Sequence, residues 1–265
     1  GSQELSLEYQ AKNKVFTVAL KSVGDFVVLG DLMKSMSVFN YKQQEGTLEE
    51  IARDNNIYWM SDVEIVDQDV MIGAENEYNI FTVRRNTTSE NEEERRTLEI
   101  VGRYHVGDLI NRFRHGSLVM NTAAKASESE DIELTNKREK SLRRNKLEEI
   151  SKPIIYGTVS GSIGIIARLT KEQFEYFAHV QDAMNTVVKG VGNFKHDEYR
   201  AIKLAGRKER ATNFLDGDLI ESFLDLRRER QEQVASHLRT LTKNDENSSI
   251  DEIVRRIEEL AVTLH

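Results

Sequence analysis

The feature that most constrains the fold is a repeat in the first half of the chain. The run Phe26–Gly30 is echoed by Asp69–Gly73, and Ser37–Phe39 is echoed by Asn79–Phe81. The glycines that end the first two runs are 43 residues apart, and a period of roughly 40–50 residues is typical of a four-stranded propeller blade. Short apolar runs separated by Gly, Asp and Asn turns also favour strands. The repeat therefore predicts successive antiparallel blades.

A third copy of the repeat is stretched by an insert. Asn111–Val119 has the pattern of its first strand, and Ile154–Val159 and Ile163–Leu169 have the pattern of the next two. Gly157 then takes the position of the repeated glycine. Three blades are fewer than the four to eight of a closed propeller. The sequence thus predicts a partial β-propeller of about three four-stranded blades, whose remaining blades lie elsewhere.

The pattern changes near residue 170 from short strands to amphipathic helices. We assign residues 1–169 to the partial propeller and residues 170–265 to a helical C-terminal domain. Two polar, charged inserts near 86–96 and 121–152 are expected to be mobile loops. The predicted fold class is mainly β with a C-terminal α part.

Helix starts are marked by capping residues. Thr170-x-x-Gln173 and Ser249-x-x-Glu252 are capping boxes that precede amphipathic runs. Asp216 or Asp218 can cap a third helix. These signals predict at least three helices in the second domain.

No cluster in the sequence carries a catalytic or metal-binding signature. The chain has no Cys, and its six His residues fall in no metal-ligand spacing. Asp216-Gly217-Asp218 fits a turn and helix cap better than acid–base chemistry. Gly157-x3-Gly161-x2-Gly164 lies between two predicted strands, which favours a tight hairpin over a phosphate loop. We therefore expect no enzyme activity, no cofactor and no metal.

The charge balance argues against nucleic acid as a direct partner. Lys and Arg number 37 and Asp and Glu number 45, for a formal net charge of −8. Basic residues between Lys137 and Lys146 are consistent with an import signal or a nucleic-acid patch. Acidic residues between Glu128 and Glu133 precede them and favour a solvated loop instead. No apolar run approaches the roughly 18 residues of a membrane span, so no membrane association is expected.

Trp59 is the only Trp in the chain and follows a turn at the start of a predicted strand. One interpretation is a core aromatic residue between blades. The other is an anchor in a protein interface, where Trp is enriched. The sequence leaves both open.

Several phrases resemble the last propeller of the damage-specific DNA-binding protein 1 family, the adaptors of cullin-4 RING ubiquitin ligases. The resemblance runs in order over nearly the whole chain. It is carried by Gly24–Ser35, Leu48–Asp54, Trp59-Met60, Gly73–Asn76, His115–Met120 and Phe214–Asp225. It implies three seven-bladed propellers and a helical domain, of which this chain is the last part of the third propeller plus the helical domain.

The resemblance also implies a pocket on this propeller that binds a helical motif of substrate receptors. Lys34 stands where Arg is common in the family, so a bidentate contact would be lost. Leu109 stands where an aromatic residue is usual, and Ala19 is a further departure. The implied pocket residues are Asn13, Val15, Phe16, Val18, Ala19, Lys34, Arg53, Trp59, Leu109, Asn111 and Val159.

The implied partners are substrate receptors, the remaining propellers of the same adaptor and, through the middle propeller, cullin-4. Damaged DNA would be recognised by a partner subunit, and the implied localisation is nucleus and cytoplasm. An alternative is a propeller scaffold subunit of splicing factor 3b or of a cleavage and polyadenylation complex, because these share the architecture.

Overall fold

The computed structural model describes residues 16–117, 153–204, 207–242 and 248–264. The described chain divides into two compact units. The first comprises residues 16–116 and 153–166 and consists of β-sheets. The second begins at Ala167 and is mainly helical.

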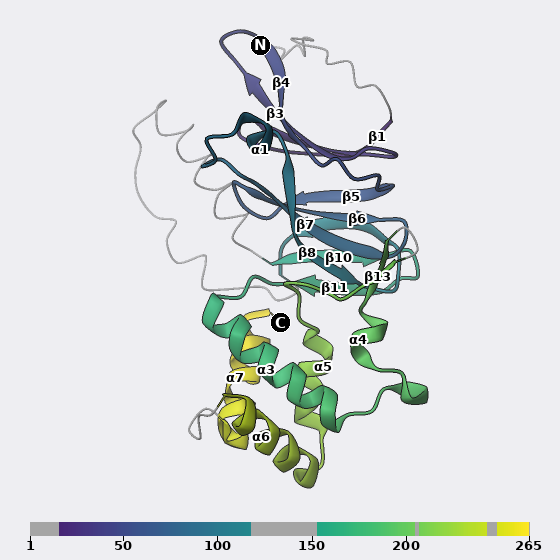
Figure 1. Ribbon diagram of the computed structural model, residues 1–265, viewed down its shortest axis with the longest axis vertical. Coiled ribbons are helices and arrows are strands. Elements are labelled where there is room, and N and C mark those ends of the chain that lie inside the picture. The colour runs from purple at the N-terminus through teal and green to yellow at the C-terminus, as the bar shows by residue number, and fades with distance from the viewer. Residues whose placement is uncertain (1–15, 118–152, 205–206, 243–247, 265) are drawn as a thin grey trace, which may run out of the picture. The chain divides into compact units, whose positions relative to one another are not determined.

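The first unit contains three antiparallel sheets in which each strand pairs with its neighbour in sequence (Figure 1). The first sheet consists of β1 (Thr17–Val23), β2 (Phe26–Asp31), β3 (Ser35–Lys42) and β4 (Thr47–Arg53). The second consists of β5 (Met60–Ile65), β6 (Val70–Glu75), β7 (Asn79–Arg85) and β8 (Leu98–His105). The third consists of β9 (Ile110–His115), β10 (Ile154–Thr158) and β11 (Ile163–Ile166). The three successive sheets confirm the partial propeller. The first two have the four strands predicted for a blade, and the third has three strands within the described residues.

The repeat is real, but its register differs from the one that the glycines indicate. The turn Asp31–Ser35 joins β2 to β3, and the turn Glu75–Asn79 of equal length joins β6 to β7. Aligning the two turns places Gly30 opposite Ala74 instead of Gly73. Because side chains alternate along a strand, this one-residue difference turns the two glycines toward opposite faces of their sheets.

Both glycines consequently face the interface between the first and second sheets. A Cβ added to Gly30 would lie 2.8 Å from the Val63 side chain on β5. A Cβ added to Gly73 would lie 2.9 Å from the Met36 side chain on β3. At Gly30 the Cβ would clash with a branched Val side chain, so the sheets pack at a distance that favours glycine there, whereas at Gly73 the ends of the flexible Met60 and Met36 side chains would have to move.

Polar contacts also join the innermost strands of the three sheets. Asp62 on β5 is fully buried, and its Oδ2 accepts the Phe113 backbone N–H of β9 at 2.7 Å. Lys21 on β1 forms an ion pair with Glu64 on β5 at 2.6 Å and donates to the Phe113 carbonyl at 3.2 Å. These contacts fix the height of each sheet relative to the next.

Within the described residues, the third sheet has one covered and one open face. Phe113 and Ile154 are buried on the side of the second sheet. Gly157 pairs with Arg112 next to a bulge, as Gly30 pairs with Ala19, so it is the counterpart of Gly30. A Cβ added to Gly157 would meet no described atom within 4 Å. Ile163, its partner on β11, is 66% exposed.

The second unit packs helices around an apolar cluster that includes Phe177, Met184, Phe223, Leu238 and Ile253. The capping box at Thr170 and Gln173 is formed, and Asp216 caps α5, as predicted. The Ser249 side chain accepts from the Glu252 backbone N–H at 3.2 Å, the first half of the second box. The elements are α3 (Lys171–Val187), η2 (Val191–Asn193), α4 (His196–Tyr199), β12 (Ile202–Leu204), β13 (Arg207–Glu209), α5 (Gly217–Glu221), η3 (Ser222–Asp225), α6 (Arg228–Thr242) and α7 (Ile250–Leu264).

The structure describes one of the two predicted inserts. The charged insert near 86–96 connects β7 to β8 and contains a one-turn helix, α1 (Glu92–Arg95), capped by Asn91. Its mobility stays a prediction. Arg96 at its end accepts the Arg53 backbone N–H at 2.9 Å, which fastens the insert to the first sheet. The insert at 121–152, with its basic cluster, lies outside the described residues. None of the helices in the described ranges is long and apolar enough to cross a membrane.

Candidate partner-binding surface

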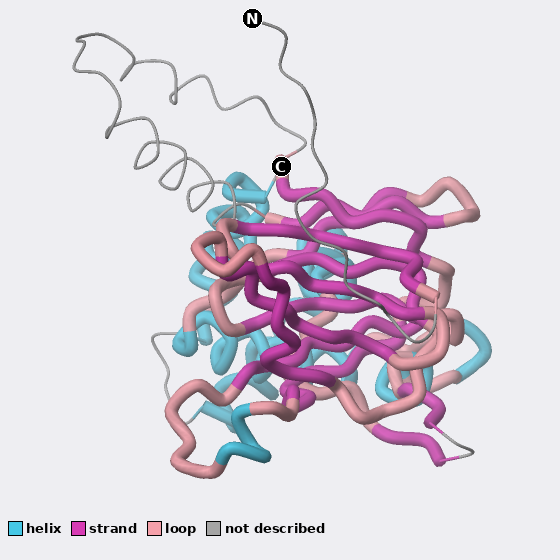
Figure 2. The backbone as a smooth tube through the Cα atoms, turned by 90° about the horizontal axis from the view of Figure 1, so that it is seen from above, coloured by secondary structure: helices cyan, strands magenta, loops and turns pink. Residues whose placement is uncertain are grey.

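One end of the three sheets is formed by turns and connections that are joined by backbone hydrogen bonds. In an antiparallel meander the turns after β2, β6 and β10 and the connections β4–β5 and β8–β9 all lie at the same end of the strands; loops gather at both strand ends in Figure 2. The bonds run from Leu32 N to Phe16 O (2.8 Å), Ser35 N to Tyr58 O (3.2 Å), Asn76 N to Trp59 O (3.0 Å), Val106 N to Tyr78 O (2.9 Å) and Val159 N to Leu109 O (2.9 Å). This end is therefore a continuous surface with a fixed backbone.

Large apolar side chains are exposed along this end. We call this set the apolar edge. Ile57 is 81% exposed and Trp59 is 50% exposed. Exposed apolar residues concentrated over neighbouring loops mark interaction sites in soluble proteins. The members of the apolar edge are Phe16, Leu32, Met33, Ile57, Trp59, Tyr78 and Val159.

Alternation along the β4–β5 connection places Trp59 outside the core. Its neighbour Tyr58 is buried and packs on Phe81 with ring centroids 4.7 Å apart. The next residue, Met60, is also buried. Trp59 between them is half-exposed, and its backbone carbonyl accepts from Asn76. This position is that of an available anchor and not of a core aromatic residue.

Buried carboxylates shape the turns beneath the apolar edge. Asp31 Oδ1 accepts the backbone N–H of Met33 (2.9 Å) and Lys34 (3.1 Å). Glu75 plays the same part in the second sheet, where it accepts the Glu77 and Asn79 N–H groups. Burial raises the pKa of Glu75, and these hydrogen bonds oppose the shift. The exposed turn tips are therefore held in fixed conformations.

Nine of the eleven predicted pocket residues fall into three groups. Phe16, Trp59 and Val159 are exposed members of the apolar edge, and Asn111 on β9 is also exposed. Val18, Lys34 and Leu109 are half-buried at or near the same end. Asn13 and Val15 lie outside the described residues.

The placement of Ala19 on the pocket wall is wrong. Its side chain is only 3% exposed and lies 3.4 Å from the position that a Gly30 Cβ would take. Ala19 belongs to the interface between the first and second sheets, where a small side chain is required. A partner at the apolar edge cannot reach it.

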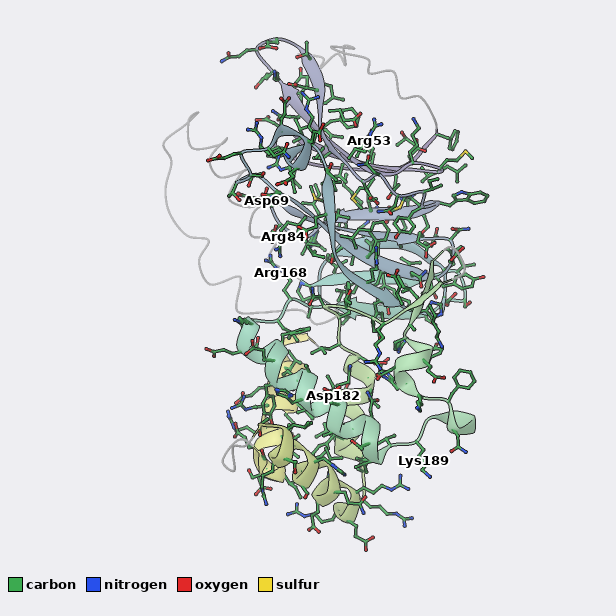
Figure 3. All side chains as sticks on the ribbon, in the orientation of Figure 1. Arg53, Asp69, Arg84, Arg168, Asp182 and Lys189 are labelled. Carbon is green, nitrogen blue, oxygen red and sulfur yellow. The ribbon has the colours of Figure 1, made fainter. Side chains whose placement is uncertain are left out.

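Arg53 is exposed, but it lies on an outer strand, whereas Trp59 lies beside an inner strand. It ends β4, the outermost strand of the first sheet, whereas Trp59 precedes β5, the innermost strand of the second. Its guanidinium, labelled in Figure 3, binds both oxygens of Glu50 at 2.6 and 2.7 Å. A partner that uses Arg53 would compete with Glu50.

Sequence reasoning missed four members of the apolar edge, namely Leu32, Met33, Ile57 and Tyr78. Apolar residues next to strands are normally assigned to the core. The available signal is their position: Leu32 and Met33 occupy the centre of a turn, and Tyr78 adopts a positive φ of 67° in another. Turn centres are solvent-facing, so apolar residues there need a separate explanation.

The second unit contains a buried ionic cluster around Asp216. Its Oδ2 accepts from His196 Nε2 and from Arg200 Nε, both at 2.7 Å. Burial acts to raise the pKa of Asp216, but the His196 hydrogen bond and the Arg200 charge outweigh it and hold the pKa well below its usual range. The cluster fastens α4 to the cap of α5, which agrees with the structural interpretation of Asp216-Gly217-Asp218. Among the described residues no group of three or more His, Asp or Glu is arranged to hold a metal ion.

Comparison with known proteins identifies the family. Residues 1–225 match the family described as CPSF A subunit region. The chain belongs to this family. DNA damage-binding protein 1a of Arabidopsis thaliana is 41% identical over 260 residues, and DNA damage-binding protein 1 of Oryza sativa subsp. japonica and of Solanum lycopersicum are 42% and 41% identical. Each alignment covers 98% of this chain and 21% of the relative, so the chain spans about a fifth of their length. The resemblance to the damage-specific DNA-binding protein 1 family is confirmed.

Proposed function

We propose that this chain is a non-catalytic part of an adaptor that joins substrate receptors to a cullin-4 RING ubiquitin ligase. The observation that carries the proposal is the apolar edge, which offers seven exposed apolar side chains on fixed backbone. The relatives are named DNA damage-binding proteins, which supports a role in the response to DNA damage.

The apolar edge suits a helical motif of a receptor better than an extended strand. Strand addition needs a free sheet edge with unpaired backbone groups, whereas backbone groups at this end bond to one another. An amphipathic helix needs an apolar floor with a few polar groups beside it. Trp59 and Ile57 supply large apolar contacts, and Lys34 and Asn111 supply polar groups.

The other partners follow from the same proposal. Further propeller blades of the adaptor would cover the open face of the third sheet, and cullin-4 would bind elsewhere on the adaptor. DNA would be contacted by a receptor and not by this chain, whose net charge is −8. We propose no membrane association and a location in nucleus and cytoplasm.

An RNA-processing scaffold is the second candidate. The family description names the CPSF A subunit, so the family match fits this candidate as well. The names of the relatives at 41–42% identity favour the DNA-damage adaptor. Pulldowns with a receptor helix and with splicing subunits would separate the two.

Substitution of Trp59 by Ala tests the proposal. Truncation of an interface Trp costs on the order of 2–4 kcal/mol, so affinity for a receptor helix should fall by roughly 30-fold or more. The matched control is Val262→Ala, which removes an 82% exposed apolar side chain from α7 in the second unit. Titration calorimetry measures both. Equal affinities for the two variants, or a Trp59→Ala variant that is unfolded by circular dichroism, would contradict the proposal.

A further inference from the structure

The connection between β7 and β8 gathers hydroxyl and carboxylate side chains at the outer edge of the second sheet. Three consecutive hydroxyl residues, Thr87, Thr88 and Ser89, precede Glu90 and the three glutamates of α1 at 92–94. Within the five residues that follow each hydroxyl residue, Thr87 has two glutamates, Thr88 has three and Ser89 has four. Ser89 therefore has the most acidic C-terminal flank of the three.

The Ser89 hydroxyl closes this insert. Its Oγ donates to Glu94 Oε2 at 2.6 Å and accepts the Asn91 backbone N–H at 3.1 Å. The backbone N–H of Ser89 donates to Asn86 Oδ1 at 3.1 Å. The hydroxyl thus holds α1 against the residues that lead into it.

The other end of α1 is attached to the first sheet. The Arg96 carbonyl accepts the Arg53 backbone N–H at 2.9 Å, and Thr97 forms a parallel bridge with Arg53. Figure 1 labels α1 beside the strands of the first sheet. Because α1 is a single turn, a change at the contact between Ser89 and Glu94 reaches this attachment within a few residues.

We propose that Ser89 is a phosphorylation site of an acidophilic protein kinase, and that phosphorylation loosens the attachment of the insert to the first sheet. The inference goes beyond the proposed function and does not rest on it. A kinase whose substrate groove is basic is complementary to the four carboxylates that follow Ser89. Access requires α1 to open, and none of its residues is buried, so opening loses no apolar packing.

The transferred group would face a like charge. The Ser89 Oγ attacks the γ-phosphorus of ATP, the bond to the β-phosphate oxygen breaks, ADP leaves, and the hydroxyl proton passes to a base of the kinase. The hydroxyl that donated to Glu94 becomes a group with a charge of about −1.5 to −2. Residues 86–97 already carry four glutamates and two arginines, a net charge of −2, and Arg96 is paired with Glu92 at 2.7 Å. The phosphate and Glu94 therefore repel each other, and the contact that closes the insert opens.

Phosphate incorporation tests the site. The chain is incubated with Mg²⁺-ATP and casein kinase 2, an acidophilic kinase, and the modified residue is identified by tandem mass spectrometry. Ser89→Ala should abolish incorporation into residues 86–97, whereas the matched control Thr88→Ala should retain it. No phosphate in this segment, or phosphate that persists there after Ser89→Ala, overturns the inference.

Amide exchange tests the consequence. Phosphorylation should lower the protection factor of the Arg53 amide by about fivefold, the ratio expected for loss of one intramolecular hydrogen bond. The Asp54 amide bonds to the Met36 carbonyl within the first sheet at 2.9 Å, so it is the internal control and should not change. Glu94→Gln removes the like charge and keeps three of the four flanking carboxylates, so the phosphorylated variant should retain its Arg53 protection. An unchanged Arg53 amide after phosphorylation, or an equal loss in phosphorylated Glu94→Gln, overturns the inference, while the proposed function is tested separately by Trp59→Ala.

Discussion

The first and third sheets carry the same strand pattern but differ in what covers them. On the first sheet, Gly30 faces Val63 of the second sheet with no room for a side chain. On the third sheet, Gly157 occupies the corresponding position and faces open space in the described part of the chain. The sequence at both positions satisfies the same packing requirement, yet only one has the neighbour that imposes it. Gly157 and the exposed Ile163 are the features expected of a blade whose face is not yet packed against a further blade.

Substitutions on the two faces of the third sheet should show the largest difference in unfolding free energy. Phe113, on the covered face, is fully buried, so Phe113→Ala is expected to cost about 3–5 kcal/mol of unfolding free energy. Ile163→Ala on the open face should change stability by less than about 0.5 kcal/mol. Urea denaturation of the two variants measures both. Similar losses would mean that the open face is already covered, for example by a second copy of the chain.

Substitution of the two equivalent glycines, Gly30 and Gly157, should give a smaller difference in unfolding free energy that depends more specifically on the neighbouring blade. Gly30→Val would force the first and second sheets apart and should cost about 1–3 kcal/mol. Gly157→Val meets no described atom and should be neutral or slightly stabilising, because Val suits a strand better than Gly. If further blades are supplied and Gly157→Val then becomes destabilising, the next blade approaches as the second sheet approaches Gly30. An unchanged midpoint with those blades present would contradict that geometry.

Much of the fold was predictable because its signals are local. The blade period and the capping box at Thr170 depend on a few residues each, and both are found. The register of the repeat was not predictable from glycine identity, since Asp31 and Glu75 perform the same task in the two turns with different side chains. The apolar edge was only partly predictable, because Leu32 and Ile57 have the composition of core residues and only the turn geometry exposes them. The burial of Ala19 was not predictable either, because which face of β1 is covered depends on the neighbouring sheet.

One buried carboxylate in each unit, Glu75 in the sheets and Asp216 in the helices, is predicted to respond oppositely to acid. Burial raises the pKa of Glu75 in the sheet unit, so its protonation on acidification does not remove stability. The pKa of Asp216 in the helical unit is lowered, so its contribution is complete above the unfolded value near 3.9 and is lost as the pH falls below it. The free energy of opening of α3 and α5, obtained from amide exchange after correction for the intrinsic exchange rate, should therefore fall between about pH 4 and pH 3. Asp216→Asn, which keeps a capping side chain, should flatten this dependence, and Asp218→Asn should not. Identical pH profiles for both variants would mean that other carboxylates control the helical unit.

The smallest expected effect concerns association through the open face. Three isoleucines lie on the face that carries Gly157, namely Ile155, Ile163 and Ile165. Gly157 pairs with Ile163 and Ile155 pairs with Ile165, and residues two apart on a strand share a face. Without a further blade, this face should bind an apolar dye and promote weak self-association. Ile163→Lys places a charge at its centre and should lower dye fluorescence and the sedimentation-derived association constant, by about two- to tenfold, with an unchanged unfolding midpoint. Val262→Lys, at a still more exposed apolar position in the other unit, is the control and should change neither. A monodisperse chain that binds no dye before substitution would show that the third sheet is covered, and the difference between Gly30 and Gly157 would then need another cause.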